Sequence, residues 1–313
     1  MDLRVLFLGT GARAPTPERL VASTMLIRGA QHILIDCGEG TQRQLLRSIA
    51  GLRGLDTILL SHTHADHVLG LPGLLATFSD QREAPLTLAG PPGTARLVDG
   101  FRPHFGRLRF PLEVREVDAG EAIAGDGYRL ESVAARHAGA ALGWALVEDD
   151  SPGRLDAEAA RAHGVPDGPA MGRLADGEDV GPVRGSEVVG PPRAGRRVVV
   201  SGDTAPATTL ERAARRADLL VHEATFLERD RELAAEAGHS TAAQAAALAS
   251  RAGVRMLALT HRSTRYEAEE VAAEAMALFP ATVVPRDLDL VVVPLPDHGA
   301  PRLMRGAGRD PTA

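Results

Sequence analysis

The sequence contains a single cysteine, Cys37, and no lysine, so all 35 of its lysine-or-arginine positions are arginine. One cysteine excludes an internal disulfide and suits the reducing cytoplasm, where we expect the protein to act. Arginine binds phosphate through a planar, bidentate fork, although a high-GC genome produces the same bias without a functional cause. The net charge of −6 argues weakly against a nucleic-acid partner but allows a local basic face.

Long apolar runs are also missing. None reaches the roughly 18–20 residues that a membrane-spanning helix needs, and residues 1–7 lead directly into a strand pattern rather than a signal peptide. Hydrophobic residues make up 44% of the 313 residues and charged residues 24%, as in an ordinary globular protein. We therefore expect no membrane association, and either one large domain or two small ones.

Three histidines and a carboxylate fall within six residues of one short segment, residues 61–67, which reads Ser-His-Thr-His-Ala-Asp-His. The apolar run 58–60 before it predicts a strand, so these groups should lie on a loop at a strand end. Imidazoles and carboxylates suit zinc and similar ions. An extended backbone turns His62 and His64 the same way, and the pair Asp66–His67 then reaches a neighbouring point, which favours two ions. The alternative, a loop of solvated histidines, is disfavoured by four such groups at this spacing.

Other candidate groups stand at the ends of strand-like runs further along the chain. Taken alone, they indicate little: a histidine at such a place is equally compatible with a core position, and Gly-Asp-Thr is typical of a turn. A histidine before an alanine-rich helix with Ser240 as N-cap could meet a phosphate, because a helix N-terminus favours anions. Asp36 could be the hydrogen-bond partner of a ligating histidine or a simple turn residue. The candidates in these positions are His137, Asp203, Glu223, His239 and His261.

Residues 150–195 differ in character from the rest, because glycine and proline are dense there and aromatic residues are absent. Such a segment is either a flexible linker or a functional loop. We expect the tail, residues 299–313, to be disordered. Acidic side chains outnumber basic ones in the glycine-rich segment, which suits phosphates poorly: Arg154, Arg161, Arg173 and Arg184 stand against Asp156, Glu158, Asp167, Asp176, Glu178, Asp179 and Glu187.

The metal-ligand motif and the Val-Leu-Gly-Leu-Pro-Gly-Leu-Leu after it resemble the metallo-β-lactamase superfamily. Further segments resemble one of its families, ribonuclease Z, the tRNA 3′-processing endoribonucleases. The chain departs from the family pattern at Leu20, where relatives carry asparagine, and at Arg262, where they carry an aromatic residue. The segments that carry the resemblance are Leu-Gly-Thr-Gly with Pro-Thr-Pro-Glu-Arg, Asp-Cys-Gly-Glu-Gly-Thr-Gln-Arg-Gln, His-Glu-Ala-Thr with Gly-His-Ser-Thr, and Thr-His-Arg-Ser-Thr-Arg-Tyr.

The resemblance implies an α/β (α+β) fold, an αββα sandwich over residues 1–298, in which residues 150–195 form a protruding arm that binds tRNA. It implies a homodimer that removes the 3′ trailer of precursor tRNA and leaves a 3′-hydroxyl. It also implies two divalent ions, zinc or alternatively manganese. In that reading Asp66 orients and deprotonates the attacking water, and His239, supported by Glu223, protonates the leaving oxygen. The implied ligands are His62, His64 and His137 for one ion, Asp66, His67 and His261 for the other, and Asp203 between them.

Two other functions remain open from the residues. A small-molecule phosphodiesterase or arylsulfatase on the same fold is favoured by the acidic arm and opposed by the Gly-Glu-Gly-Thr-Gln and His-Ser-Thr segments. A non-catalytic RNA-binding protein would require broken ligands, and all seven are present.

Overall fold

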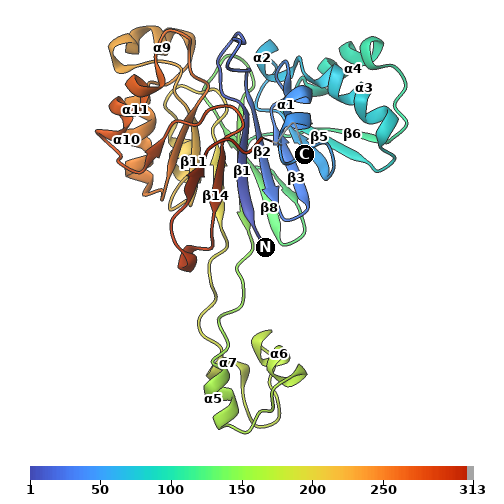
Figure 1. Ribbon diagram of the computed structural model, residues 1–313, viewed down its shortest axis with the longest axis vertical. Coiled ribbons are helices and arrows are strands. Elements are labelled where there is room, and N and C mark those ends of the chain that lie inside the picture. The colour runs from blue at the N-terminus through green and yellow to red at the C-terminus, as the bar shows by residue number, and fades with distance from the viewer. Residues whose placement is uncertain (309–313) are drawn as a thin grey trace.

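The computed structural model describes residues 1–308, which form two stacked β-sheets with helices on both outer faces and a long arm that projects from one end (Figure 1). This is the αββα sandwich that the resemblance implied, and the predicted fold class is confirmed. Among residues 1–308, no helix is long and apolar enough to cross a bilayer.

The first sheet has eight strands in the order β15-β14-β1-β2-β3-β4-β5-β6. Strands β2 and β3 form the expected antiparallel hairpin, which Gly29 closes with a φ of 58°. From β3 to β6 the strands run parallel, so their carboxyl ends meet at one edge. The strands are β1 (Leu3–Gly9), β2 (Ser23–Arg28), β3 (Gln31–Ile35), β4 (Leu55–Leu59), β5 (Leu86–Gly90), β6 (Leu112–Glu116), β14 (Leu290–Val293) and β15 (Arg302–Met304).

The second sheet has seven strands in the order β13-β12-β11-β10-β9-β8-β7. Its strands β10 to β13 are parallel, and their carboxyl ends again share one edge. The candidate ligands of both halves follow such carboxyl ends. The strands are β7 (Ala122–Ala124), β8 (Tyr128–Ala134), β9 (Leu142–Glu148), β10 (Arg197–Val200), β11 (Leu219–Glu223), β12 (Leu257–Thr260) and β13 (Thr282–Val283).

Helices cover the outer face of each sheet (Figure 1). The alanine-rich helix α10 packs its small buried side chains closely onto the second sheet. Its N-cap is Thr241, in a capping box with Gln244, and not the predicted Ser240, whose hydroxyl donates instead to the carbonyl of Thr204. The helices are α1 (Thr41–Arg47), α2 (Ala65–Val68), α3 (Leu71–Gln81) and α4 (Thr94–Phe105) beside the first sheet, and α8 (Thr208–Ala213), α9 (Arg231–Ala237), α10 (Ala242–Ala252) and α11 (Ala268–Met276) beside the second, with short 3-10 turns at Glu228–Asp230 and Pro296–His298.

The two sheets are joined by an apolar core and by one buried ionic cluster. Trp144 of β9 is 1% exposed, and its indole N–H donates to the carbonyl of Leu60 in the other half at 3.0 Å. At the far end of the strands, Glu148 accepts hydrogen bonds from Arg28 of β2 at 2.8 Å and from Arg196 at 2.6 Å. Because the three charges come from both sheets, they hold the sandwich together at the end opposite the candidate ligands.

The arm has a small core of its own, separate from the core of the sandwich. It contains α5 (Ala157–Ala162), α6 (Pro169–Ala175) and α7 (Gly185–Val188), at the end of two extended chain segments that Figure 1 shows reaching far from the body. The two segments approach so closely that a Cβ on Gly153 would lie 1.8 Å from the carbonyl oxygen of Gly190. Glycine is therefore required at that crossing.

The expectation of a disordered tail is wrong for residues 299–308. Strand β15 pairs with β14, because Leu303 alternates inward against the central core while its neighbours face solvent. Gly308 forms a further bridge with Ser48. The rest of that expectation, residues 309–313, lies outside the described part of the chain.

Candidate metal centre

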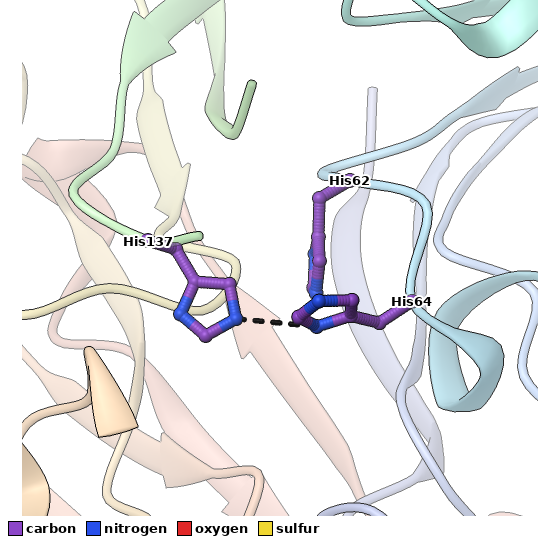
Figure 2. A group of neighbouring side chains, drawn as sticks. All are labelled: His62, His64 and His137. Atoms are coloured by element: carbon purple, nitrogen blue, oxygen red, sulfur yellow. Dashed lines mark hydrogen bonds between the residues drawn. The ribbon is translucent and has the colours of Figure 1, made fainter. Parts of the chain in front are cut away.

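Three histidines from both halves of the chain meet at the edge where the parallel strands end. His62 and His64 lie on the loop after β4, and His137 follows β8 of the other sheet. The Nε2 atom of His137 lies 3.2 Å from Nδ1 of His64, as Figure 2 shows. The ring centroid of His62 is 4.5 Å from that of His64 and 4.9 Å from that of His137. The three imidazoles therefore face a single point.

A second group lies beside the first and again draws on both sheets. Asp66 and His67 come from α2, and His261 follows β12. Asp66 Oδ2 is 3.4 Å from His261 Nε2 and 3.8 Å from His67 Nε2. His261 holds a left-handed backbone conformation with φ 52°. Such a conformation costs about 1–3 kcal/mol in a non-glycine residue, so it persists only where the surrounding structure enforces it.

Asp203 stands between the two groups. It follows β10, and its Oδ2 lies 3.3 Å from Nε2 of His67, 3.3 Å from Nε2 of His261 and 3.7 Å from Nε2 of His62. All seven predicted ligands are thus close together, although they are spread from position 62 to position 261. The structure leaves none of them outside the cluster.

The chemistry of these atoms fits divalent cations. Within residues 1–308, His62 Nε2, His67 Nε2 and Asp203 Oδ1 are buried and have no hydrogen-bond partner. Such atoms cost about 1–3 kcal/mol each when nothing binds them. Burial, with the charge of His67 next, lowers the pKa of His62 to about 2, so its imidazole is neutral and can donate a lone pair. A nitrogen-rich set with two carboxylates is a donor set that zinc accepts.

The remaining ring nitrogens bond to fixed acceptors or hydroxyls, which orients the rings. His67 Nδ1 lies 2.7 Å from Asp36 Oδ2, and His137 Nδ1 donates to the carbonyl of Gly238 at 2.9 Å. His261 Nδ1 is 2.9 Å from the hydroxyl of Thr225. Burial lowers the pKa of His67, but the charges of Asp203 and Asp36 outweigh burial and raise it well above its ordinary value.

Two hydroxyl residues in this outer layer were not predicted. Ser61 Oγ donates to Asp36 Oδ2 at 2.8 Å and lies 2.9 Å from Nδ1 of His62. Thr225 donates to Glu223 Oε2 at 2.6 Å besides contacting His261. Their positions, directly before His62 and two residues after Glu223, are the only signals in the sequence that point to them.

Glu223 and His239 form a hydrogen-bonded pair beside the cluster, and their ligand-type atoms lie within 4.8 Å of that of His261. His239 Nδ1 lies 2.8 Å from Glu223 Oε1, and the carboxylate also accepts the backbone N–H of Thr204 at 2.7 Å. Burial lowers the pKa of His239, but the hydrogen bond and charge of Glu223 outweigh burial and raise it. The contact with Glu223 uses Nδ1, and the side chain of His239 is 14% exposed.

Comparison with known proteins identifies the family of this chain. Residues 31–155 and 158–262 match the model of the beta-lactamase superfamily domain. Ribonuclease Z of Methanosarcina acetivorans is 41% identical over 300 residues, which span 93% of this chain and 98% of that protein. The chain belongs to the ribonuclease Z family. Ribonuclease Z of Myxococcus xanthus is 44% identical over 275 residues, which span 85% of this chain and 89% of that one.

A solved structure agrees with the ribonuclease Z assignment. The short form of human tRNase Z superposes with a TM-score of 0.69 at 25% sequence identity, covering 93% of this chain and 99% of that one. The segments first seen to resemble ribonuclease Z therefore belong to a likeness that extends over nearly the whole chain.

Proposed function

We propose that the protein is a metal-dependent endoribonuclease that removes the 3′ trailer from precursor tRNA and leaves a 3′-hydroxyl on the tRNA. The observation that carries the proposal is the convergence of seven ligand-type side chains from both sheets in a member of the ribonuclease Z family. The curated relatives carry the name ribonuclease Z, and the similar solved structure is a tRNase Z.

In this proposal His62, His64 and His137 would hold one cation, Asp66, His67 and His261 would hold the other, and Asp203 would be available to both. Two divalent ions, when bound there, would lower the pKa of a water and offset negative charge on the scissile phosphate. The nitrogen-rich donor set favours zinc over manganese, which prefers oxygen ligands.

The protein's own groups move the protons. Within residues 1–308, Asp66 contacts Arg13 N at 2.7 Å and His261 at 3.4 Å, both through Oδ2. In this proposal its other oxygen, Oδ1, orients the attacking water and accepts its proton. Water attacks phosphorus while the bond from phosphorus to the 3′ oxygen of the tRNA breaks. His239, kept protonated by Glu223, donates a proton from Nε2 to that leaving oxygen.

We infer that precursor tRNA is also contacted by the arm and that the protein acts in the cytoplasm as a homodimer. A dimer is supported by exposed apolar side chains on the helical side of the first sheet. Leu46 of α1, Ile49 and Leu69 are 52%, 41% and 52% exposed. Light scattering on the wild type and on Leu46→Glu tests this: we expect a dimer that the charge weakens, and a monomeric wild type would contradict it.

The test of the main proposal uses full-length protein with zinc and a tRNA that carries a 3′ extension. We expect a mature tRNA ending in a 3′-hydroxyl and a trailer with a 5′-phosphate. The His64→Ala variant is the matched control for contaminating nucleases. If the extended tRNA stays intact at any ratio of enzyme to substrate, the proposal is wrong.

A small-molecule phosphodiesterase is the second candidate, and the acidity of the arm favours it. Arm acids such as Asp156, Glu158 and Asp167 would repel the phosphates of a large RNA. Turnover of bis(p-nitrophenyl) phosphate without any cleavage of the extended tRNA would support this second function over the first.

A further inference from the structure

A pocket of about 420 Å³ is lined by residues of three segments, 16–19, 262–269 and 286–287. Arg262, which directly follows His261, lines it together with Arg19. The backbone N–H of Arg262 donates to the carbonyl of Thr10 at 3.0 Å, and its carbonyl accepts from Ala12 N at 3.1 Å. The loop formed by residues 10–20 also reaches Asp66 through the backbone N–H of Arg13. These hydrogen bonds connect the segment that carries Arg19 to Arg262 and to the proposed ligand Asp66.

The two arginines that line the pocket carry buried donor atoms for which residues 1–308 provide no hydrogen-bond partner. Arg262 is only 6% exposed, and within residues 1–308 its Nε has no hydrogen-bond partner. The same holds for Nη1 of Arg19. Two like charges with buried free donors are costly unless an anion lies between them.

Four carboxylates and a third arginine, Arg286, also line the pocket, and the carboxylates are those of Glu18, Glu267, Glu269 and Asp287. Glu18 is exposed and accepts a hydrogen bond from Thr16 Oγ1 at 3.4 Å. Asp287 accepts Thr10 N at 3.0 Å, Thr10 Oγ1 at 2.8 Å, Leu20 N at 2.7 Å and Gln44 Nε2 at 3.2 Å. Glu267 caps the start of α11 and is exposed, as is Glu269. No salt bridge joins either arginine to an acid within the described residues.

We propose that Arg19 and Arg262 form a phosphate subsite that binds a phosphodiester of the RNA strand near the scissile bond. The inference rests on the proposed function and adds to it a contact specific to this chain, because the aromatic residue of the family pattern cannot donate hydrogen bonds to phosphate. Guanidinium groups suit this ligand, since they bind phosphate oxygens bidentately. The two arginines also supply positive charge, whereas acidic side chains outnumber basic ones in the arm.

The test compares Arg262→Gln, Arg262→Phe and Arg19→Gln with wild type in cleavage of a 3′-extended tRNA at several salt concentrations. We expect KM to rise about tenfold or more with kcat changed by less than about threefold, since a charged hydrogen bond is lost from binding. The salt slope of log kcat/KM should become shallower by roughly 0.7–0.9 for the lost phosphate contact. Arg251→Gln, which removes an arginine of α10 that pairs with Glu211 of α8, is the matched control.

Two arginines on one phosphate should also be coupled, so the double variant Arg19→Gln/Arg262→Gln should raise KM by less than the product of the single effects. Thermal unfolding shows whether each variant is folded. If the Arg262 variants unfold, Arg19→Gln still tests the subsite, because Arg19 is only half-buried and its replacement disturbs the fold less. The subsite is overturned if Arg19→Gln and every folded Arg262 variant show the same KM and the same salt slope as the Arg251→Gln control.

Titration with inorganic phosphate separates the failure of the subsite from that of the proposed function. If wild type does not cut the tRNA, the proposed function fails, and the subsite stands only if calorimetry shows phosphate binding that Arg262→Gln abolishes. A third outcome is that the wild type cuts the tRNA and binds inorganic phosphate, while the arginine variants keep the wild-type KM for tRNA. The pocket would then bind small anions only, and the proposed RNA contact would be overturned.

Discussion

His67 and Asp36 are joined by a hydrogen bond of 2.7 Å between Nδ1 and Oδ2, deep beneath the proposed metal site. The carboxylate accepts the proton of Nδ1, so the ring turns Nε2 towards Asp203 at 3.3 Å and makes it the nitrogen that an ion would reach. Asp36 holds a φ of 60°, a conformation that aspartate tolerates better than most residues, and this turn aims its carboxylate at both Ser61 and His67. A residue 31 positions away thus sets the orientation of a proposed ligand.

Asp36→Asn should weaken zinc binding by about 10–100-fold, because partners of this kind contribute that much to metal affinity. The amide keeps the size of the side chain but removes the charge that fixes the imidazole proton. Competition with a chromogenic zinc chelator measures the change. Asp99→Asn on α4, an exposed acid paired with Arg102, is the control, and equal affinities of the two variants would contradict the role of Asp36.

His64→Ala should abolish cleavage of extended tRNA while the affinity for tRNA changes by only a few-fold. The imidazole stands beside His137 at the solvent side of the cluster, and its loss removes one donor without disturbing the core. Gel-shift titrations with the extended tRNA give the affinity, and metal analysis gives the zinc content. A large loss of affinity would show that His64 serves binding or folding instead.

His239→Ala should lower kcat by about 10²–10⁴-fold, the usual contribution of general acid–base catalysis. Zinc content should stay at the wild-type level, because His239 is not one of the seven proposed ligands. Glu223→Gln should lower kcat less, since the imidazole remains and only the carboxylate 2.8 Å from its Nδ1 is neutralised. Single-turnover kinetics with parallel metal analysis check both, and a loss of zinc in His239→Ala would reassign that residue to metal binding.

Glu148→Gln should destabilise the protein by about 3–5 kcal/mol at neutral pH, because Arg28 and Arg196 then remain buried without a counter-charge. Burial raises the pKa of Glu148, but hydrogen bonds from Arg196 and Arg28 outweigh burial and lower it below 4.5. The stabilisation is therefore present above pH 4.5 and is lost as pH falls through the lowered value.

Urea unfolding of wild type and Glu148→Gln at neutral and acidic pH tests both parts of that prediction. The difference in the free energy of unfolding should be largest at neutral pH and should shrink towards acid. Glu211→Gln, which removes a surface partner of Arg251, is expected to cost less than about 1 kcal/mol. A difference that grows on acidification would contradict the assignment.

The sequence alone predicted the part of the site that is contiguous. Residues 61–67 show four ligand-type groups at a strand end, and the structure places them as a cluster. His137, Asp203 and His261 could not be joined to that loop by local reasoning, because their convergence depends on how two sheets stack. Only the likeness of longer segments to a known family brought them into the prediction.

Other features were missed for reasons that are physical and local. The hydrogen-bond partners of the Ser61 and Thr225 hydroxyls depend on the local direction of the backbone. The pattern of apolar and polar residues in the sequence does not predict that direction. Strand β15 was missed because Arg302–Met304 is too short and too polar to give a strand signal, yet it pairs with the free edge of β14. Tertiary pairing decides such segments more than propensity does.

The order of the seven side chains along the chain has a consequence for synthesis. His62, His64, Asp66 and His67 leave the ribosome early, whereas His261 follows almost two hundred residues later, as the second sheet is completed. A nascent or truncated chain that ends before His261 would therefore lack part of the second proposed ion site. Under the proposed function, cellular RNA would not meet an active nuclease until translation had passed β12 and the two halves had closed on each other.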